Sequence, residues 1–262
     1  MDGSPNRTFQ VNELTPDPNV AFDPKVAKSY VTYAHRLAAR GLVNSSVGGM
    51  VIRVAHPDHP DGVCYAKPQG ISLEEVEEED LVITDIPWGR ILQGERATTV
   101  GHQMNREILR LRPDVKVVAH THPFHACVFS ASLEALQPFT LDADYFIDVP
   151  RHVADVALIT TKEEGIALAQ SLGDGFAVLM GNHGVTFCGA SVPQAACVGL
   201  FLEKACKAQL AGLAAGFRSS LPGRAIREKR HRQIMTPVHW EHSWNYFCRK
   251  LAARGDASAI YG

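Results

Sequence analysis

The sequence predicts an α/β protein. Segments with apolar residues three and four positions apart, typical of amphipathic helices, alternate along the chain with short apolar runs typical of strands. The chain has 262 residues, 45% of them apolar, which is ample for a sizeable core. Since no linker divides these segments, we expect one domain over residues 25–262 with a helical and aromatic C-terminal tail. Residues 1–24 are polar and contain prolines, and we expect a flexible or surface-draped arm there.

In the N-terminal half, the first expected helix covers residues 24–40, and Gly41 follows as a C-terminal glycine cap. Strands at 51–54 and 63–65 form a hairpin around a turn that contains prolines and histidines. Residues 73–80 carry six carboxylates and are expected to form a solvated acidic helix. Strands at 81–85 and 91–93 precede a helix over 99–111, with Thr98 or Thr99 as its N-cap.

In the C-terminal half, an apolar strand over 117–122 leads into a short helix and loop over 124–136. A strand is expected at 156–160, and Thr161 with Glu164 forms a capping box that opens a helix ending at residue 172. Strands at 176–180 and 185–188 precede a long helix over 191–215. From residue 216 the tail is basic and then aromatic, with Trp240, Trp244, Tyr246 and Phe247.

Three histidines stand at the ends of apolar runs. His120 and His122 are one residue apart on a predicted strand and therefore share a face, and His183 is the best candidate for a third ligand. Three imidazoles with an open position are typical of a catalytic metal site, whereas a structural zinc site has four protein ligands. The alternative is that these are unrelated buried histidines satisfied by backbone groups. We predict one divalent transition ion per chain, and imidazole ligands suit zinc, manganese or iron(II).

The composition excludes several classes of partner. A formal net charge of -2 gives no general attraction to nucleic acid or to an anionic membrane. No apolar run approaches the ~20 residues that a membrane-spanning helix needs. The N-terminus lacks the apolar stretch of a signal peptide, and the six cysteines show no CxxC spacing. We therefore expect reduced thiols in a cytoplasmic enzyme that acts on a small molecule.

Several motifs together give the sequence a family resemblance. They are Gly41-Leu42-Val43, Lys67-Pro68-Gln69-Gly70-Ile71, Arg112-Pro113-Asp114-Val115, Val118-Ala119-His120-Thr121-His122-Pro123 and Gly181-Asn182-His183-Gly184-Val185. In order and spacing the sequence resembles the class II aldolase/adducin family from about residue 26 to residue 209. The resemblance implies a three-layer α/β/α fold around a largely antiparallel sheet. It also implies a ring-shaped homotetramer with active sites between subunits, and metal binding by His120, His122 and His183.

The catalytic glutamate of the sugar-phosphate aldolases in this family is missing. Those enzymes place it about nineteen residues before the first histidine, and that position here is Gly101. The glutamate moves a proton at the enediolate carbon, so another residue would have to act as the acid or base. His102 and Glu107 are the candidates for proton transfer. The alternative for His102 is a surface imidazole at a helix start.

The phosphate-binding residues of those aldolases are also replaced. The corresponding positions read Gly48-Gly49, Gln69 and Thr99-Val100, which offer few side-chain donors for phosphate. Phe124 and Tyr145 follow the metal motif and favour an uncharged or aromatic substrate portion, although such residues also fill cores. Arg53, Lys67 and Gln69 remain as candidates to bind a carboxylate.

Two kinds of reaction agree with these departures. The family that the sequence resembles includes metal-dependent decarboxylases of hydroxylated aromatic or pyridine carboxylic acids, and decarboxylation is the reaction we favour. The family also includes a non-haem iron oxygenase of aminocoumarin biosynthesis, which oxidatively shortens an aryl 2-oxo acid. This oxidative reaction is our alternative. A sugar aldolase is less favoured, and so is a non-catalytic adducin-like module, because adducin-type domains lack the three histidines. Apolar residues in the last helices also favour a homo-oligomer.

Overall fold

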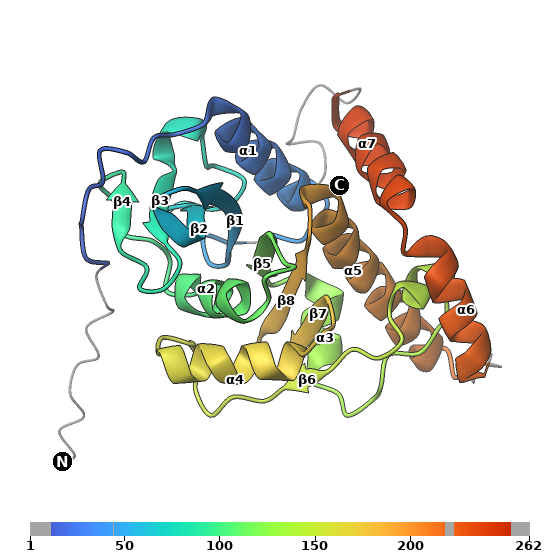
Figure 1. Cartoon of the computed structure of the whole chain (residues 1–262). Helices are drawn as coiled ribbons and strands as arrows, with labels where there is room; N and C mark the ends of the chain where they lie inside the picture. Colours follow the sequence, from blue (N-terminus) through green and yellow to red (C-terminus); the bar gives the residue numbers. More distant parts are fainter. Residues whose placement is uncertain (1–11, 44, 218–222, 253–262) are drawn as a thin grey trace, which may run out of the picture.

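The computed structural model describes residues 12–43, 45–217 and 223–252, and its centre is a mixed sheet with helices on both faces (Figure 1). Eight strands of the described chain form the sheet in the order β4-β3-β2-β1-β5-β8-β7-β6. They are β1 (Gly49–His56), β2 (His59–Ala66), β3 (Val82–Asp85), β4 (Ile91–Gln93), β5 (Val117–Thr121), β6 (Arg151–His152), β7 (Ala177–Met180) and β8 (Gly184–Gly189). Every neighbouring pair is antiparallel except β6 and β7. The expected largely antiparallel sheet is confirmed.

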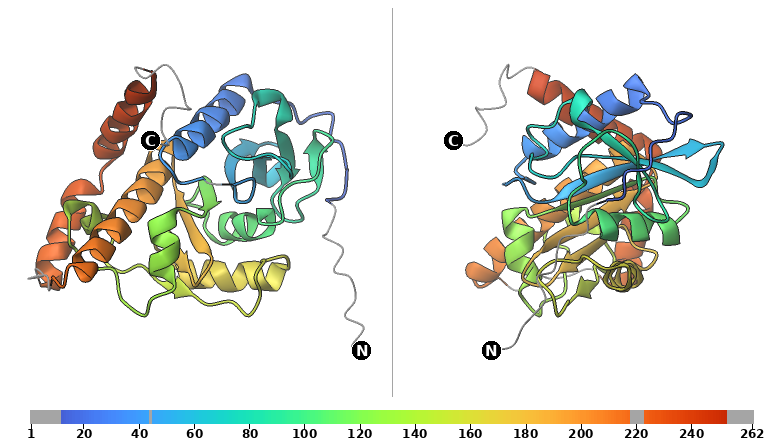
Figure 2. Two further views of the ribbon diagram at one scale, coloured as in Figure 1. Left: turned by 180° about the vertical axis from the view of Figure 1, so that it is seen from behind. Right: turned by 90° about the vertical axis from the view of Figure 1, so that its left-hand side faces the viewer.

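The helices form the two outer layers. They are α1 (Pro24–Ala38), α2 (His102–Leu111), α3 (Phe124–Ser130), α4 (Lys162–Leu172), α5 (Val192–Ala214), α6 (Arg224–Ile234) and α7 (Pro237–Ala252). Figure 2 shows α1 and α5 on the opposite side of the strands from α2 and α4. Side chains of β5 alternate between two cores, with Val117 and Ala119 facing α1 and α5 and Val118 facing α2 and α4. This alternation confirms the three-layer α/β/α architecture.

Side-chain caps start most of the predicted helices. Asp23 accepts a hydrogen bond from the backbone N–H of Lys25 at the start of α1, and Ser191 caps α5 in the same way. The capping box of Thr161 and Glu164 at the start of α4 is present as predicted. Helices α2 and α3 have no side-chain cap. Helix α2 begins at His102 after Gly101, so the predicted cap at Thr98 or Thr99 is wrong.

Two predicted elements are wrong. Residues 73–80 form turns and one short 3₁₀ helix, Glu78–Asp80, instead of an acidic α-helix. Six carboxylates at close spacing repel one another on a helix. The carboxylate of Glu75 instead accepts from the backbone N–H of Ser72, and the hydroxyl of Ser72 accepts from the backbone N–H of Glu74. Residues 156–160 are an irregular segment, and the strand in this region is the earlier β6.

The N-terminal and C-terminal segments pack along the core. Of the predicted arm, residues 1–11 lie outside the described part of the chain, while Thr15 donates to the carbonyl of Ile91 on strand β4. In the tail, Trp240 and Phe247 are buried against the layer that contains α5. The tail therefore hides much of the aromatic surface on which the expectation of an oligomer was based. Within the described residues, no helix combines the length and apolar character needed to cross a membrane.

Candidate metal centre

The pairing of β5 with β8 brings the three histidines together. His120 lies in β5, and His122 follows immediately after the end of this strand. Thr121 pairs with Val185 on β8, so the turn that precedes β8 lies beside His122. That turn carries His183, and its Asn182 has a φ of 56°, in the left-handed region that asparagine tolerates. Two segments about sixty residues apart therefore meet at one end of the sheet.

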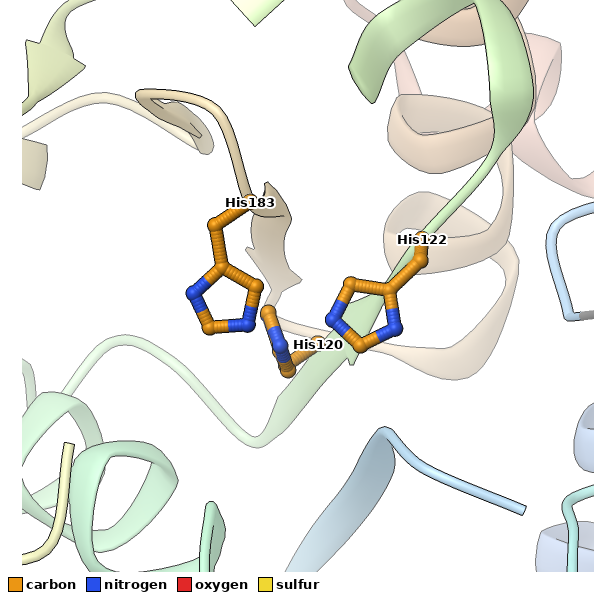
Figure 3. Close-up of side chains that lie close together, drawn as sticks. All are labelled: His120, His122 and His183. Carbon is orange, nitrogen blue, oxygen red and sulfur yellow. The ribbon is translucent and has the colours of Figure 1, made fainter. Parts of the chain in front are cut away.

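The three imidazole rings converge on one point (Figure 3). Their ring centroids are 4.7 Å apart for His120 and His122, and 5.0 Å apart for each pair that includes His183. One ligand nitrogen from each ring lies within 4.8 Å of the other two. Nitrogen ligands of a bound transition ion each lie about 2 Å from the metal, and nitrogens at this separation can reach a common ion after small rotations.

Hydrogen bonding and burial prepare the rings to act as ligands. The Nδ1 of His120 donates to the carbonyl oxygen of Val185 at 3.0 Å, which leaves the lone pair of Nε2 for a metal. Burial is the main cause that lowers the pKa of all three histidines, and it lowers that of His122 to about 4. The imidazoles are therefore neutral near pH 7, as metal coordination requires. This donor set fits a divalent transition ion.

Glycine leaves the space in which the rings meet. A Cβ atom at Gly184 would lie 2.5 Å from Cδ2 of His122 and 2.7 Å from the carbonyl oxygen of Thr121. Gly48 has a φ of +89°, and a Cβ there would lie 2.8 Å from the carbonyl oxygen of His120. Both approaches are closer than a side-chain carbon allows. The glycine after His183 is therefore needed for the site itself.

A cavity of about 260 Å³ opens onto the three imidazoles, and we call it the metal cavity. Besides the histidines it is lined by Ser46, Val47, Gly48, Gln69, Gly70, Thr99, Val100, Gly101, Met104, Leu158 and Ile159. Its walls are mostly apolar, with Ser46, Gln69 and Thr99 as the polar side chains. Among the described residues, no carboxylate, lysine or arginine lines it. Gly101 stands where the resemblance implies a glutamate, and none of the described residues brings a carboxylate into the metal cavity in its place.

The two proton-transfer candidates lie away from the metal cavity. The ring of His102 is 3% exposed and is bonded through Nε2 to the hydroxyl of Thr84 at 2.9 Å; it lines a neighbouring cavity. It is thus a buried residue, and the surface alternative is wrong. Glu107 is fully buried between α2 and α4, where Gln103 and Arg110 donate to its carboxylate. The structure brings neither residue to the three histidines.

Of the predicted substrate-binding residues, only Gln69 lines the metal cavity. The guanidinium of Arg53 donates to the carbonyls of Leu109 and Pro113 on the far side of strand β1. The ammonium of Lys67 donates to the carbonyls of Ser46 and Ile71. It therefore connects the two loops that contain these residues and does not line the metal cavity. Phe124 is 68% exposed on α3, and Tyr145 is stacked on Phe201 in the core.

Three residues that shape the site were not predicted from the sequence. Leu158 and Ile159 form an apolar wall of the metal cavity. In the sequence they belong to a short apolar run, which predicted a strand instead of a cavity wall. Glu203 on α5 bonds to the start of α3, directly after the metal motif. An isolated glutamate in a helix gives no sequence signal of such a long-range contact.

Comparisons with known proteins agree with this geometry. The sequence profile described as "Class II Aldolase and Adducin N-terminal domain" matches residues 28–210. The protein named decarboxylase NovR of Streptomyces niveus is 30% identical over 207 residues, covering 76% of each chain. A 4-hydroxy-3-prenylphenylpyruvate oxygenase/4-hydroxy-3-prenylbenzoate synthase of Streptomyces roseochromogenus subsp. oscitans is also 30% identical, over 76% of this chain and 74% of its own.

Among solved structures, an aldolase II superfamily protein from Pseudomonas syringae superposes with a TM-score of 0.78. It is 25% identical, and the match covers 89% of this chain and 96% of the other. The similarity therefore extends beyond the sheet to most of both molecules.

Proposed function

The chain belongs to the class II aldolase and adducin family, and we propose that it is a metal-dependent enzyme that breaks a carbon–carbon bond. The reaction we favour is decarboxylation of a non-phosphorylated hydroxyaryl or 2-oxo carboxylic acid. The fold supports this proposal, and so do the donor set of the three histidines and a 30% identical relative named as a decarboxylase.

The observation that carries the proposal is the lining of the metal cavity. Three neutral imidazoles stand at one end of a space whose other walls are apolar and include Val100, Leu158 and Ile159. A sugar phosphate would find neither a carboxylate base nor a cationic partner on these walls. An aromatic or aliphatic acid with an oxygen beside its carboxylate would suit them, because it can bury its carbon skeleton while the oxygen faces the histidines.

The reaction would proceed with defined roles for this chain's residues. A divalent ion held by the three histidines would supply a Lewis acid next to the bond that breaks. Gln69 and Thr99 would orient the substrate by hydrogen bonds, and the apolar walls would pack against the part of its ring or chain that lies away from the bond that breaks. The bond to the carboxylate breaks, its electron pair stays on the substrate carbon, and carbon dioxide leaves. A proton then reaches that carbon from water, since no acid of the described chain lines the cavity.

A second candidate is the oxidative reaction, because the relative named as an oxygenase is as similar as the one named as a decarboxylase. It would use iron(II) on the same histidines and one molecule of oxygen to shorten an aryl 2-oxo acid by one carbon. Carbon dioxide would leave, one oxygen atom would enter the new carboxylate, and the other would hydroxylate the carbon next to it. The lining of the metal cavity suits both substrate classes. The two proposals differ in their requirement for iron and for oxygen.

The experiment that separates them loads the metal-free protein with iron(II), manganese or zinc. Carbon dioxide release from hydroxyaryl carboxylates and aryl 2-oxo acids is followed with and without oxygen. We expect about one ion per chain and turnover that needs no oxygen. The His122→Ala variant should lose both metal and activity, while His56→Ala, which removes a histidine on the distant β1–β2 hairpin, should lose neither. Turnover confined to iron and oxygen supports the second candidate, and efficient cleavage of a sugar phosphate contradicts both.

A further inference from the structure

A second cavity adjoins the metal cavity. It measures about 280 Å³ and shares Gln69, Thr99 and Val100 with its neighbour. His102, Arg106 and Trp88 line its other walls, so we call it the arginine cavity. Small-molecule sites usually begin at roughly 300 Å³. Each cavity alone is slightly smaller, and because three residues line both, one ligand can extend from one cavity into the other.

Arg106 is the unusual feature of the arginine cavity. Its side chain is only 4% exposed, and no carboxylate of the described chain lies within ion-pair distance of it. Its terminal nitrogens donate to neutral acceptors, the carbonyl of Ile86 and the amide oxygen of Gln103, and its Nε has no partner. A buried guanidinium without a direct ion-pair partner is costly, and a bound anion would lower that cost.

The surrounding backbone is shaped around this guanidinium. Gly89 has a φ of +74°, and a Cβ there would lie 2.7 Å from Nε of Arg106 and 2.8 Å from its Cζ. The other cation of the cavity, Arg90, already has a partner, because its Nε donates to Glu13 at 3.1 Å. Arg106 is therefore the cation of the cavity without a direct ion-pair partner, and Glu107 and Asp85 act on it only from a longer distance.

His102 supplies a second buried polar group without a partner, the ring nitrogen Nδ1. Its Nε2 belongs to a short chain of contacts, 2.9 Å to the hydroxyl of Thr84 and from there 3.1 Å to the thiol of Cys64. Burial raises the pKa of Cys64 to about 11, so the thiol keeps its proton and can donate it to Thr84. Thr84 can then donate to Nε2, which places the ring proton of His102 on Nδ1. In this arrangement the Nδ1–H of His102 is a buried donor without a protein partner.

We propose that the arginine cavity is a substrate subsite that binds a carboxylate group through Arg106 and His102. The substrate would then be an acid with two carboxylates, one that is removed at the three histidines and one that is held beyond Thr99. This assignment of the substrate rests on the proposed function, whereas carboxylate binding by the cavity does not. A planar carboxylate matches the guanidinium fork better than a point-like anion does.

Binding is tested first on metal-free protein, in which the three histidines hold no ion. Titration with benzoate should give saturable binding, and inorganic phosphate should bind at least tenfold more weakly. In wild-type crystals soaked with 4-bromobenzoate, we expect the anomalous bromine peak in the arginine cavity with its carboxylate on Arg106. A peak confined to the metal cavity, or tighter binding of phosphate than of benzoate, would overturn the assignment. These two experiments use wild-type protein, so their outcome does not depend on whether the variants fold.

Variants of Arg106 then test its role in carboxylate binding. Arg106→Met should weaken benzoate binding at least tenfold, and Arg106→Lys should restore part of it. Arg110→Met is the matched control, because Arg110 lies one turn further along α2 and donates to buried Glu107 instead of lining the cavity. It should also lower stability but leave benzoate affinity unchanged. Equal affinities of wild type and Arg106→Met would contradict the proposal.

Turnover distinguishes this inference from the proposed function. In the metal-loaded enzyme, Arg106→Met should raise the KM of an aromatic dicarboxylate at least tenfold and leave the kcat within twofold, while the KM of the matching monocarboxylate stays unchanged. If benzoate binding depends on Arg106 but no acid is decarboxylated, the subsite stands and the proposed function fails. If acids are decarboxylated and Arg106→Met changes neither KM nor benzoate binding, the function stands and the subsite falls.

Discussion

The carboxylate of Glu203 on α5 accepts two hydrogen bonds from His125, one from its backbone N–H at 3.1 Å and one from its ring Nδ1 at 2.6 Å. The other carboxylate oxygen accepts from the backbone N–H of Ala126 at 2.8 Å. Helix α3 has no side-chain cap of its own, and these bonds satisfy the N–H groups at its start. Only Pro123 and Phe124 separate His122 from this anchor, so Glu203 fixes the chain that leaves the metal site.

We expect Glu203→Ala to weaken metal binding. Loss of a cap of this kind costs about 1 kcal/mol of stability, and loss of a residue that orients a metal ligand costs about tenfold or more in metal affinity. Competition with a chelator of known affinity measures the second effect. Lys204→Ala is the control, because the neighbouring ammonium bonds to Asp142 at 2.7 Å and not to α3. Unchanged metal affinity in Glu203→Ala would show that α3 does not position His122.

Gly184→Ala should destroy the metal site with little change to the rest of the fold. The added methyl group would lie 2.5 Å from the ring of His122 and 2.7 Å from the carbonyl oxygen of Thr121. The ring must therefore move away from its two partners, and the end of strand β5 must shift. We expect elemental analysis to show far less than one ion per chain, with circular dichroism unchanged. Gly223→Ala adds a methyl group that meets nothing within 4 Å and should keep its metal. A full complement of metal in Gly184→Ala would contradict the close approach.

The convergence of the three histidines could be predicted from the sequence because it depends on local pattern and strand order. His120 ends an apolar strand, His183 follows another, and two strands that pair in the centre of a sheet bring their ends together. The helices α1, α4 and α5 follow from apolar spacing and caps written in neighbouring residues. These features need no knowledge of distant contacts.

Side-chain direction and partner choice were less predictable. His102, Arg53 and Tyr145 have the chemistry of site residues, but their directions depend on which layer covers them. The partner of His102 is Thr84 on β3, a contact that neither neighbourhood in the sequence reveals. The same holds for Arg106, whose lack of a direct ion-pair partner depends on where the neighbouring carboxylates Glu107 and Asp85 lie. Long-range packing, and not local propensity, decides these positions.

We expect the protein to be a homo-oligomer, as a member of this family, and a tetramer is our specific proposal. Phe124 is 68% exposed and Val128, one turn later on α3, is 45% exposed, which leaves an apolar face beside the metal site. Light scattering at micromolar concentration should show more than one chain per particle. Phe124→Asp should lower the measured mass and Phe124→Leu should not. A monomeric wild type would contradict this proposal.

The last prediction concerns pH and Lys67, whose side chain is 1% exposed and donates to the carbonyls of Ser46 at 3.3 Å and Ile71 at 2.5 Å. Burial lowers the pKa of Lys67 to about 8 in the folded protein, whereas an unfolded lysine titrates near 10.4. Between these values the unfolded chain binds more protons than the folded one. The free energy of unfolding therefore gains a contribution that rises with pH, by at most about 1.4 kcal/mol per pH unit.

Lys67→Met lacks this contribution, while tyrosines and cysteines titrate alike in both proteins and cancel in the difference. Urea unfolding at pH 7.5, 8.5 and 9.5 should show the wild type gaining stability relative to Lys67→Met as the pH rises. Lys116→Met, which removes an exposed lysine, should show no such trend. A wild-type advantage that stays constant over this range would mean that Lys67 remains fully charged, and that its ammonium stabilises the loop of Ser46 without any shift in its pKa.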